Sequence, residues 1–242
     1  MKHSISRSVI ILAFCVAIMN LNSGCSDKLE ILIITGGHSF DTIQFFDFFK
    51  SYETISYDAI TQPEANKLLE KIGTNAYDVL VFYDMWQEIT ENQQNAYDKL
   101  LEKGTGMVFL HHSLVSYQQW GEYINIIGGK YWQEGFTSDS LKLSDYEHDL
   151  DLDIKVLDRD HPITKDMQDF RIHDEGYSNV EIISSVVPLL ETSHPFASKY
   201  VAWTNEYKQS RIVYIMLGHD YKAYENESFR KLVENAIIWA AN

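Results

Sequence analysis

Three histidines each follow a different apolar segment of the kind that forms buried strands. The segments end in Ile-Ile-Thr-Gly-Gly-His38, Val-Phe-Leu-His-His112 and Ile-Met-Leu-Gly-His219. Ligands of an open parallel sheet bind beyond the carboxyl ends of its strands, so these side chains are expected to line one pocket. Imidazole exchanges protons near neutral pH and binds divalent metals. The pattern predicts acid/base chemistry or a metal such as zinc, with His38, His112 and His219 as candidate metal ligands.

Carboxylates lie near these histidines or in a separate acidic motif. Asp41 follows His38 closely, and Glu175 lies in the motif His173-Asp174-Glu175-Gly176-Tyr177. We expect His112, His219 and Glu175 to be the catalytic residues. The residues expected to bind substrate are His38, Asp41, Trp86, His111, Tyr177 and Asp220. The sequence has no H-E-x-x-H or C-x-x-C spacing, so a metal site depends on convergence in space.

Two features of the segment Leu110 to Leu114 limit its chemistry. His111 and His112 are adjacent, so in an extended chain their side chains point to opposite faces of the sheet. We therefore expect at most one of them to face the pocket and the other to be structural. Ser113 is a possible nucleophile, but Leu-His-His-Ser-Leu lacks the glycines of a G-x-S-x-G elbow. We therefore expect Ser113 to be a hydrogen-bonding loop residue.

Tryptophan is a second candidate binding residue, because aromatic rings stack on the apolar faces of sugars. Trp86 follows a predicted strand at the same edge as the histidines, where loops carry binding residues. A pocket position and a core position remain equally open for Trp86. The core is the more frequent place for Trp120, Trp132 and Trp203.

Short apolar segments alternate with helical patterns along most of the chain. The expected strands are Ile31 to Thr35, Ile55 to Ile60, Val79 to Tyr83, Met107 to Leu110 and Ile212 to Leu217. Thr61 with Glu64 and Thr90 with Gln93 have the spacing of capping boxes. This order predicts an α/β fold, a flavodoxin-like doubly wound and mostly parallel sheet. An irregular, β-rich insertion is expected at about residues 131–207, within a single domain of residues 25–242.

The N-terminus has the layout of a secretory signal peptide over residues 1–24. Lys2 and Arg7 precede an apolar run of 11 residues, which is shorter than the roughly 20 that a membrane-spanning helix needs. Leu21-Asn22-Ser23-Gly24-Cys25 resembles a bacterial lipobox, although its Leu lies one residue too far from Cys25. Export with lipid attachment at Cys25, which would be the only contact with a membrane, is expected. Cleavage to an ordinary secreted protein, or a stray thiol at Cys25, is the alternative.

Charge and cysteine content exclude some partners and chemistries. The formal net charge of −15 becomes −17 when Lys2 and Arg7 are removed with the signal peptide. Nucleic acid is not expected as a partner, because it requires clustered Lys and Arg. Cys15 lies in the signal peptide, so the mature chain has Cys25 as its single cysteine and forms no internal disulfide.

Seven short motifs, in order along the chain, point to one family. They are Gly36 to Asp41, His111 to Ser113, Ile127 to Tyr131, Asp160 to Ile163, Asp174 to Tyr177, Leu217 to Asp220 and Ile238 to Ala241. Together they resemble the ThuA-like (trehalose utilisation) family of the class I glutamine amidotransferase-like superfamily. The resemblance covers nearly all of residues 30–242. It implies an amidotransferase-like fold and a role in carbohydrate catabolism beside oxidoreductases that act on disaccharides.

The chain departs from true glutamine amidotransferases at their nucleophile. Those enzymes place a reactive Cys after a central strand, where this chain has His112 and Ser113. Thioester chemistry on glutamine is therefore excluded. Two hypotheses remain: an enzyme that acts on a disaccharide or keto-sugar as a hydrolase, lyase or isomerase, and a non-catalytic lipoprotein that binds a sugar.

Overall fold

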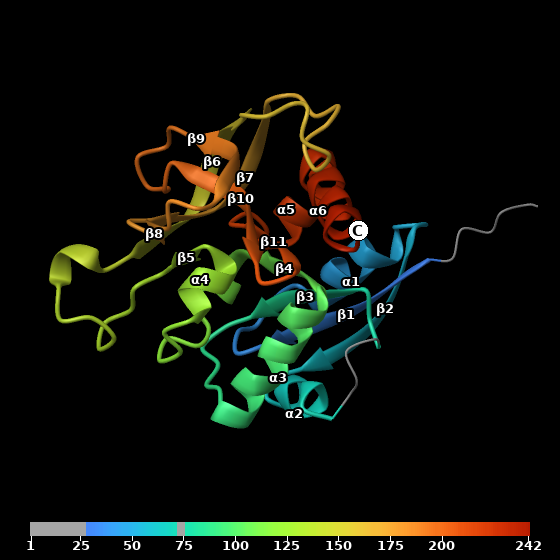
Figure 1. The fold of residues 1–242 in the computed structure, drawn as a ribbon. Helices are drawn as coiled ribbons and strands as arrows, with labels where there is room; N and C mark the ends of the chain where they lie inside the picture. Colours follow the sequence, from blue (N-terminus) through green and yellow to red (C-terminus); the bar gives the residue numbers. More distant parts are fainter. Residues whose placement is uncertain (1–27, 72–75) are drawn as a thin grey trace, which may run out of the picture.

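The computed structural model describes residues 28–71 and 76–242 (Figure 1). The predicted signal peptide and Cys25 lie outside the described residues. Among the described residues, no helix combines the length and the apolar character needed to cross a bilayer.

Nine strands form one mixed sheet in the order β2-β1-β3-β4-β11-β10-β9-β6-β7. The first five strands of this order run parallel: β2 (Ile55–Thr61), β1 (Leu29–Gly36), β3 (Val79–Asp84), β4 (Gly106–Leu110) and β11 (Ser210–Ile215). The other four run antiparallel to their neighbours: β10 (Tyr200–Tyr207), β9 (Val187–Thr192), β6 (Asp145–Val156) and β7 (Phe170–Ser178). A separate antiparallel pair joins β5 (Gly129–Lys130) to β8 (Glu181–Ile182).

The parallel half confirms the predicted fold class. Its strand order is that of a flavodoxin-like sheet, in which the chain reverses direction of winding beside the first strand. The predicted β-rich insertion supplies the antiparallel strands, which extend the same sheet and lie in the upper part of Figure 1.

Helices cover both faces of the parallel strands (Figure 1). One group packs together on one face: α1 (Thr42–Lys50), α5 (Tyr221–Glu225) and α6 (Glu227–Ala240). The other face carries α2 (Glu64–Leu69), α3 (Glu91–Lys103) and α4 (Tyr123–Ile127). Stacking of Phe48 on Phe229, with ring centroids 5.6 Å apart, joins α1 to α6. Two short 3-10 helices complete the described elements, η1 (His111–Val115) and η2 (Ser140–Lys142).

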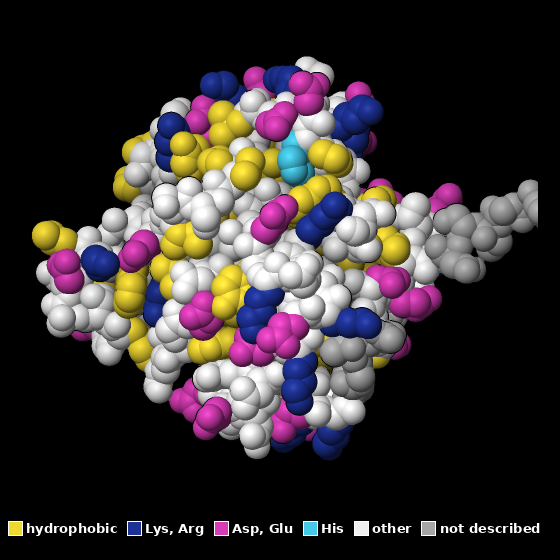
Figure 2. Space-filling model, viewed as in Figure 1, with side chains coloured by type: hydrophobic (Ala, Val, Ile, Leu, Met, Phe, Trp, Pro, Cys, Tyr) yellow, Lys and Arg dark blue, Asp and Glu magenta, His cyan; other side chains and the backbone are white. Residues whose placement is uncertain are grey.

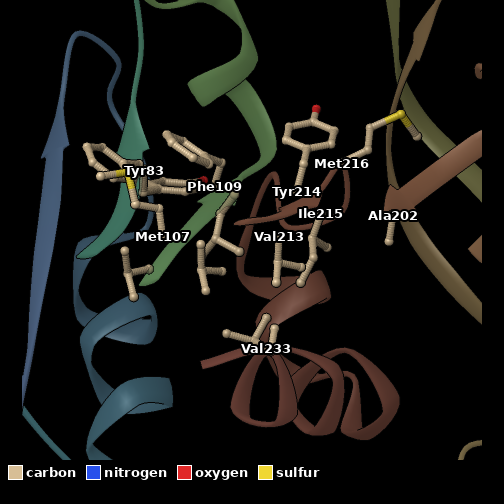
Figure 3. Close-up of a cluster of buried hydrophobic side chains, with 14 of the residues drawn as sticks. Tyr83, Met107, Phe109, Ala202, Val213, Tyr214, Ile215, Met216 and Val233 are labelled. Carbon is tan, nitrogen blue, oxygen red and sulfur yellow. The ribbon is translucent and has the colours of Figure 1, made fainter. Parts of the chain in front are cut away.

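The hydrophobic core lies on the central strands. Every residue of β3 and β4 is buried, as expected for parallel strands covered on both faces. Phe82 and Phe109 stack across these two strands with ring centroids 4.5 Å apart. Figure 3 shows Val233 of α6 directed at Val213 and Ile215 of β11. This packing fixes the strand ends at which the histidines lie.

Only one of the two predicted capping boxes forms. Thr90 and Gln93 exchange both hydrogen bonds at the start of α3. The prediction at Thr61 and Glu64 is wrong, because Thr61 pairs with Thr35 as the last residue of β2 and α2 begins after Pro63 without a side-chain cap. Thr61 therefore belongs to a strand, although the capping-box spacing assigned it to the start of a helix.

Candidate functional site at the strand ends

Five of the nine histidines gather around the carboxylate of Glu175. They are His38 after β1, His111 and His112 after β4, His148 in β6 and His219 after β11. The ring of His38 lies 5.3 Å from that of His112 and 6.1 Å from that of His219, measured between centroids. The structure thus brings together the three histidines that the strand pattern singled out.

Glu175 contacts three imidazoles. Its Oε2 lies 2.7 Å from Nε2 of His111 and 3.0 Å from Nδ1 of His219, and its Oε1 lies 3.3 Å from Nδ1 of His148. Burial acts to raise the pKa of Glu175, but hydrogen bonds from His111 and His219 hold that pKa well below its usual range. Glu175 is therefore a carboxylate, not a carboxylic acid, at neutral pH.

His219 is held at both its backbone and its ring. The buried carboxylate of Asp174 accepts hydrogen bonds from the backbone N–H groups of Gly218, at 2.7 Å, and His219, at 2.9 Å. Burial acts to lower the pKa of His219, but its hydrogen bond to Glu175 and the charge of that carboxylate raise the pKa above 6.5 overall. Donation from Nδ1 to Glu175 leaves Nε2 as the basic nitrogen, in the arrangement of a carboxylate–histidine dyad.

The site opens into a cavity of about 140 Å³, which we call the histidine cavity. Its lining residues are His38, Met85, Trp86, His112, Val115, Tyr131, Gln133, Tyr146, His148, Glu175, Tyr177 and His219. Trp86 lines this cavity and is 56% exposed, so of the two alternatives it takes the pocket position and not a core position. Trp120 and Trp203 are buried, and Trp132 donates to Glu181 at 2.7 Å.

His111 and His112 do not continue the strand in extended form. They begin the 3-10 helix η1, and His111 has a left-handed φ of 47°. His112 lines the cavity, whereas His111 is fully buried behind it and contacts Glu175. This position does not fit the predicted role of His111 in binding substrate. Burial lowers the pKa of His112 well below 6.5, and neither ring nitrogen has a partner among the described residues. Its catalytic role stays a prediction.

Three residues that the sequence analysis singled out form hydrogen bonds with backbone groups near the site. Asp41 accepts from the N–H of Tyr221 at 3.0 Å, and Asp220 accepts from the N–H of Lys222 at 2.9 Å at the start of α5. Neither lines the histidine cavity, because each satisfies an N–H at a helix start. Ser113 donates to the carbonyl of Leu110 at 2.9 Å, as expected of a loop residue.

Sequence reasoning missed His148. It lies in β6 on the same alternate positions as the buried Leu150 and Leu152, which is a signal for the inner face. A register shift between Glu147 and Leu150, with φ of 55° at Asp149, interrupts that alternation. The alternation of residues in β6 therefore could not predict that His148 contacts Glu175.

The described residues offer a divalent cation a donor set that shares only His219 with the predicted candidates. Donor atoms of His111, Glu175 and His219 lie within 4.8 Å of one another, whereas His38 and His112 do not join this group. Nδ1 of His111 lies 2.6 Å from the carbonyl of Met216, to which it must donate. Nε2 of His111 then lies 2.7 Å from Oε2 of Glu175, 3.0 Å from the hydroxyl of Tyr177 and 3.1 Å from Nδ1 of His219.

Solved structures share the fold. A protein from Parabacteroides merdae described as ThuA-like is 17% identical, with 89% of this chain and 90% of that chain covered and a TM-score of 0.74. Another from Bacteroides uniformis is 20% identical, with 88% and 91% covered and a TM-score of 0.65. A β-galactosidase from Bacillus circulans is 12% identical, with 84% of this chain but 30% of that chain covered and a TM-score of 0.55.

Sequence comparison identifies the family. No curated protein matches this chain. The ThuA family, described as trehalose utilisation, matches residues 30–240, which is most of the chain. The protein therefore belongs to the ThuA family, as the motifs around His38, His112, Glu175 and His219 predicted.

Proposed function

We propose that this protein is an enzyme of carbohydrate catabolism that processes a disaccharide or keto-sugar by proton transfer at His219. The observation that carries the proposal is the 3.0 Å contact between Glu175 and Nδ1 of His219 at a cavity. A carboxylate that accepts from Nδ1 selects one tautomer and directs the basic Nε2 elsewhere. The family description, trehalose utilisation, supports a sugar as the substrate.

A keto-sugar suits this site chemically. A carbonyl makes the neighbouring C–H acidic, so a single positioned base can remove that proton and begin elimination or isomerisation. Nε2 of His219 is the base in this proposal, and Glu175 stabilises the imidazolium that forms. His38 and His148, on other walls of the cavity, are the groups available to hydrogen-bond substrate oxygens. Burial and the positive charges of neighbouring histidines lower the pKa of His38, which favours its neutral form.

Export and lipid attachment at Cys25 are part of the proposal. Their support is the charged start, the apolar run and the small residues before Cys25 in the sequence. Figure 2 shows Lys and Arg interspersed with Asp and Glu on one face of the described residues, without a continuous basic patch there. That face therefore lacks the clustered positive charge by which proteins bind nucleic acid.

The test is incubation of the purified protein with disaccharides and their keto forms, followed by NMR detection of products. Turnover that His219→Ala and Glu175→Gln both lower by roughly 100-fold is expected, since positioned proton transfer contributes about that much. Binding without any product would refute catalysis and favour the sugar-binding alternative. Parallel incubations contain added zinc or manganese. Turnover that requires either metal would indicate that Glu175 and His219 are metal ligands, and it would refute the role of His219 as the base.

A further inference from the structure

A second cavity adjoins the histidine cavity. It has a volume of about 390 Å³, and we call it the tryptophan cavity. Trp86, Val115 and Gln133 line both cavities, so one ligand can extend from one to the other along these side chains. The histidine cavity, at about 140 Å³, is smaller than the roughly 300–1,000 Å³ of ordinary ligand sites, whereas the tryptophan cavity falls in that range.

Most side chains that line the tryptophan cavity are aromatic or neutral amides; the others are the aliphatic Ile89 and Val115 and the acidic Glu88. Trp86 and Phe136 are large apolar side chains that stay 56% and 40% exposed. The amides come from Gln87, Gln94, Gln118, Gln119 and Gln133. Aromatic faces contact the C–H faces of a sugar ring, and amides both donate to and accept from hydroxyls. This lining suits an uncharged polyhydroxylated ring.

The backbone around the cavity is held in an uncommon conformation. Trp86 and Tyr117 have left-handed φ values of 53° and 51°, and both line this cavity. The N–H of Tyr117 donates to the carbonyl of Gln87 at 2.9 Å, which ties the two loops together. The buried hydroxyl of Tyr117 lies 2.9 Å from Nε2 of Gln62. Such fixed, strained residues cluster at ligand sites, where they position side chains before the ligand arrives.

We infer that the tryptophan cavity is a second sugar subsite, so that the substrate is a disaccharide whose reacting ring enters the histidine cavity while its other ring stacks in the tryptophan cavity. The inference rests on the proposed function, because it takes the histidine cavity as the reacting site. In an elimination, Nε2 of His219 takes the C–H proton, the C–O bond to the second ring breaks, and that ring leaves as an alcohol after its oxygen takes up a proton; in an isomerisation it stays attached. Its contacts with Trp86, Phe136 and the amides select substrates with two rings over free monosaccharides.

Binding measured by calorimetry tests the subsite separately from turnover. The probes are glucose and trehalose, each also as its keto derivative, and an aryl glucoside. We expect each disaccharide to bind at least tenfold more tightly than the matching monosaccharide. Phe136→Ala and Gln94→Ala, which change residues of the tryptophan cavity alone, should reduce that preference at least fivefold without weakening monosaccharide binding. Phe196→Ala is the matched control, because Phe196 is 55% exposed and lines neither cavity.

Failure of the subsite and failure of the proposed function give different results. Equal affinity for one and two rings, or unchanged disaccharide binding in Phe136→Ala and Gln94→Ala, overturns the subsite even if turnover is found. Tighter binding of the aryl glucoside than of any disaccharide overturns the sugar as occupant. Disaccharide preference that depends on Phe136, with no product from any probe, supports the subsite and refutes the proposed catalysis.

Discussion

Oε2 of Glu175 lies 3.0 Å from Nδ1 of His219, so a carboxylate from the antiparallel half of the sheet orients a histidine from the parallel half. The same strand provides Asp174, which holds the backbone of His219 at 2.9 Å. Adjacent acids of β7 thus fix both the position and the tautomer of a single imidazole.

This contact predicts a shift in pH dependence. The neutral form of His219 accepts the proton, so kcat/KM should rise as pH increases through the pKa of His219. Glu175 raises that pKa, and Glu175→Gln should therefore move the rise to lower pH while reducing kcat roughly 100-fold. NMR titration of the imidazole gives the same shift without activity. Glu181→Gln is the control, because Glu181 binds Trp132 instead. An unmoved midpoint in Glu175→Gln would contradict the dyad.

Asp174 is predicted to be a positioning residue. Asp174→Ala leaves the backbone N–H groups of Glu175, Gly218 and His219 without an acceptor, which should lower the free energy of unfolding by about 3 kcal/mol, at roughly 1 kcal/mol for each. We also expect kcat to fall about tenfold and the pH midpoint of His219 to shift, with partial rescue by Asp174→Asn. Asp139→Ala, which removes a carboxylate from an exposed turn, should change neither. Normal kinetics in Asp174→Ala would exclude the positioning role.

Asp84 should make stability depend on pH. Burial raises the pKa of Asp84 from 3.8 to about 7, although a hydrogen bond from Gln62 opposes the shift. The folded protein retains a proton here that the unfolded chain releases, so the free energy of unfolding falls as pH rises from about 4 to 7. The loss is on the order of 4 kcal/mol.

Asp84→Asn removes this titration, so its stability relative to the wild type should increase steadily between pH 4.5 and pH 8 in urea unfolding. Asp47→Asn, at an exposed ion pair of α1, is the control and should show a constant difference. A difference that does not change with pH in Asp84→Asn would mean that the buried carboxyl is ionised throughout.

Gly37 is predicted to hold the loop of His38 against the loop of Trp86. It has a φ of +83°, and an added Cβ would lie 1.8 Å from the carbonyl oxygen of Met85. Gly37→Ala should therefore separate the two loops, lower Tm and reduce turnover, with at least about 1–2 kcal/mol lost to the left-handed backbone alone. Gly121→Ala meets no atom within 4 Å and should behave as the wild type. Equal Tm values for both variants would contradict this packing.

Lipid attachment is predicted at Cys25. Cys25→Ser should move the protein from the membrane fraction to the soluble exported fraction, because the acyl chains are the expected anchor. Cys15→Ser, within the predicted signal peptide, is the matched control and should stay with the membrane. Mass spectrometry that finds an unmodified N-terminus at another residue would disprove the anchor.

The sequence alone determined the parallel half of the sheet and the edge at which its histidines lie. The reason is local: apolar runs of strand length alternate with helical patterns, and consecutive parallel strands place their carboxyl ends at one edge. His38, His112 and His219 could therefore be grouped without a structure, and the motifs around them identified the family.

Tertiary structure alone decided which groups touch. The strand order β10-β9-β6-β7 is not the order of the chain, so no periodic pattern indicates that β7 carries Glu175 to His219. His148 contacts Glu175 beside a register shift in β6, and the 3-10 turn that begins at His111 places His111 behind the cavity and His112 in its wall. Long-range pairing and departures from regular backbone geometry set these contacts, and neither is encoded in the spacing of residues along the chain.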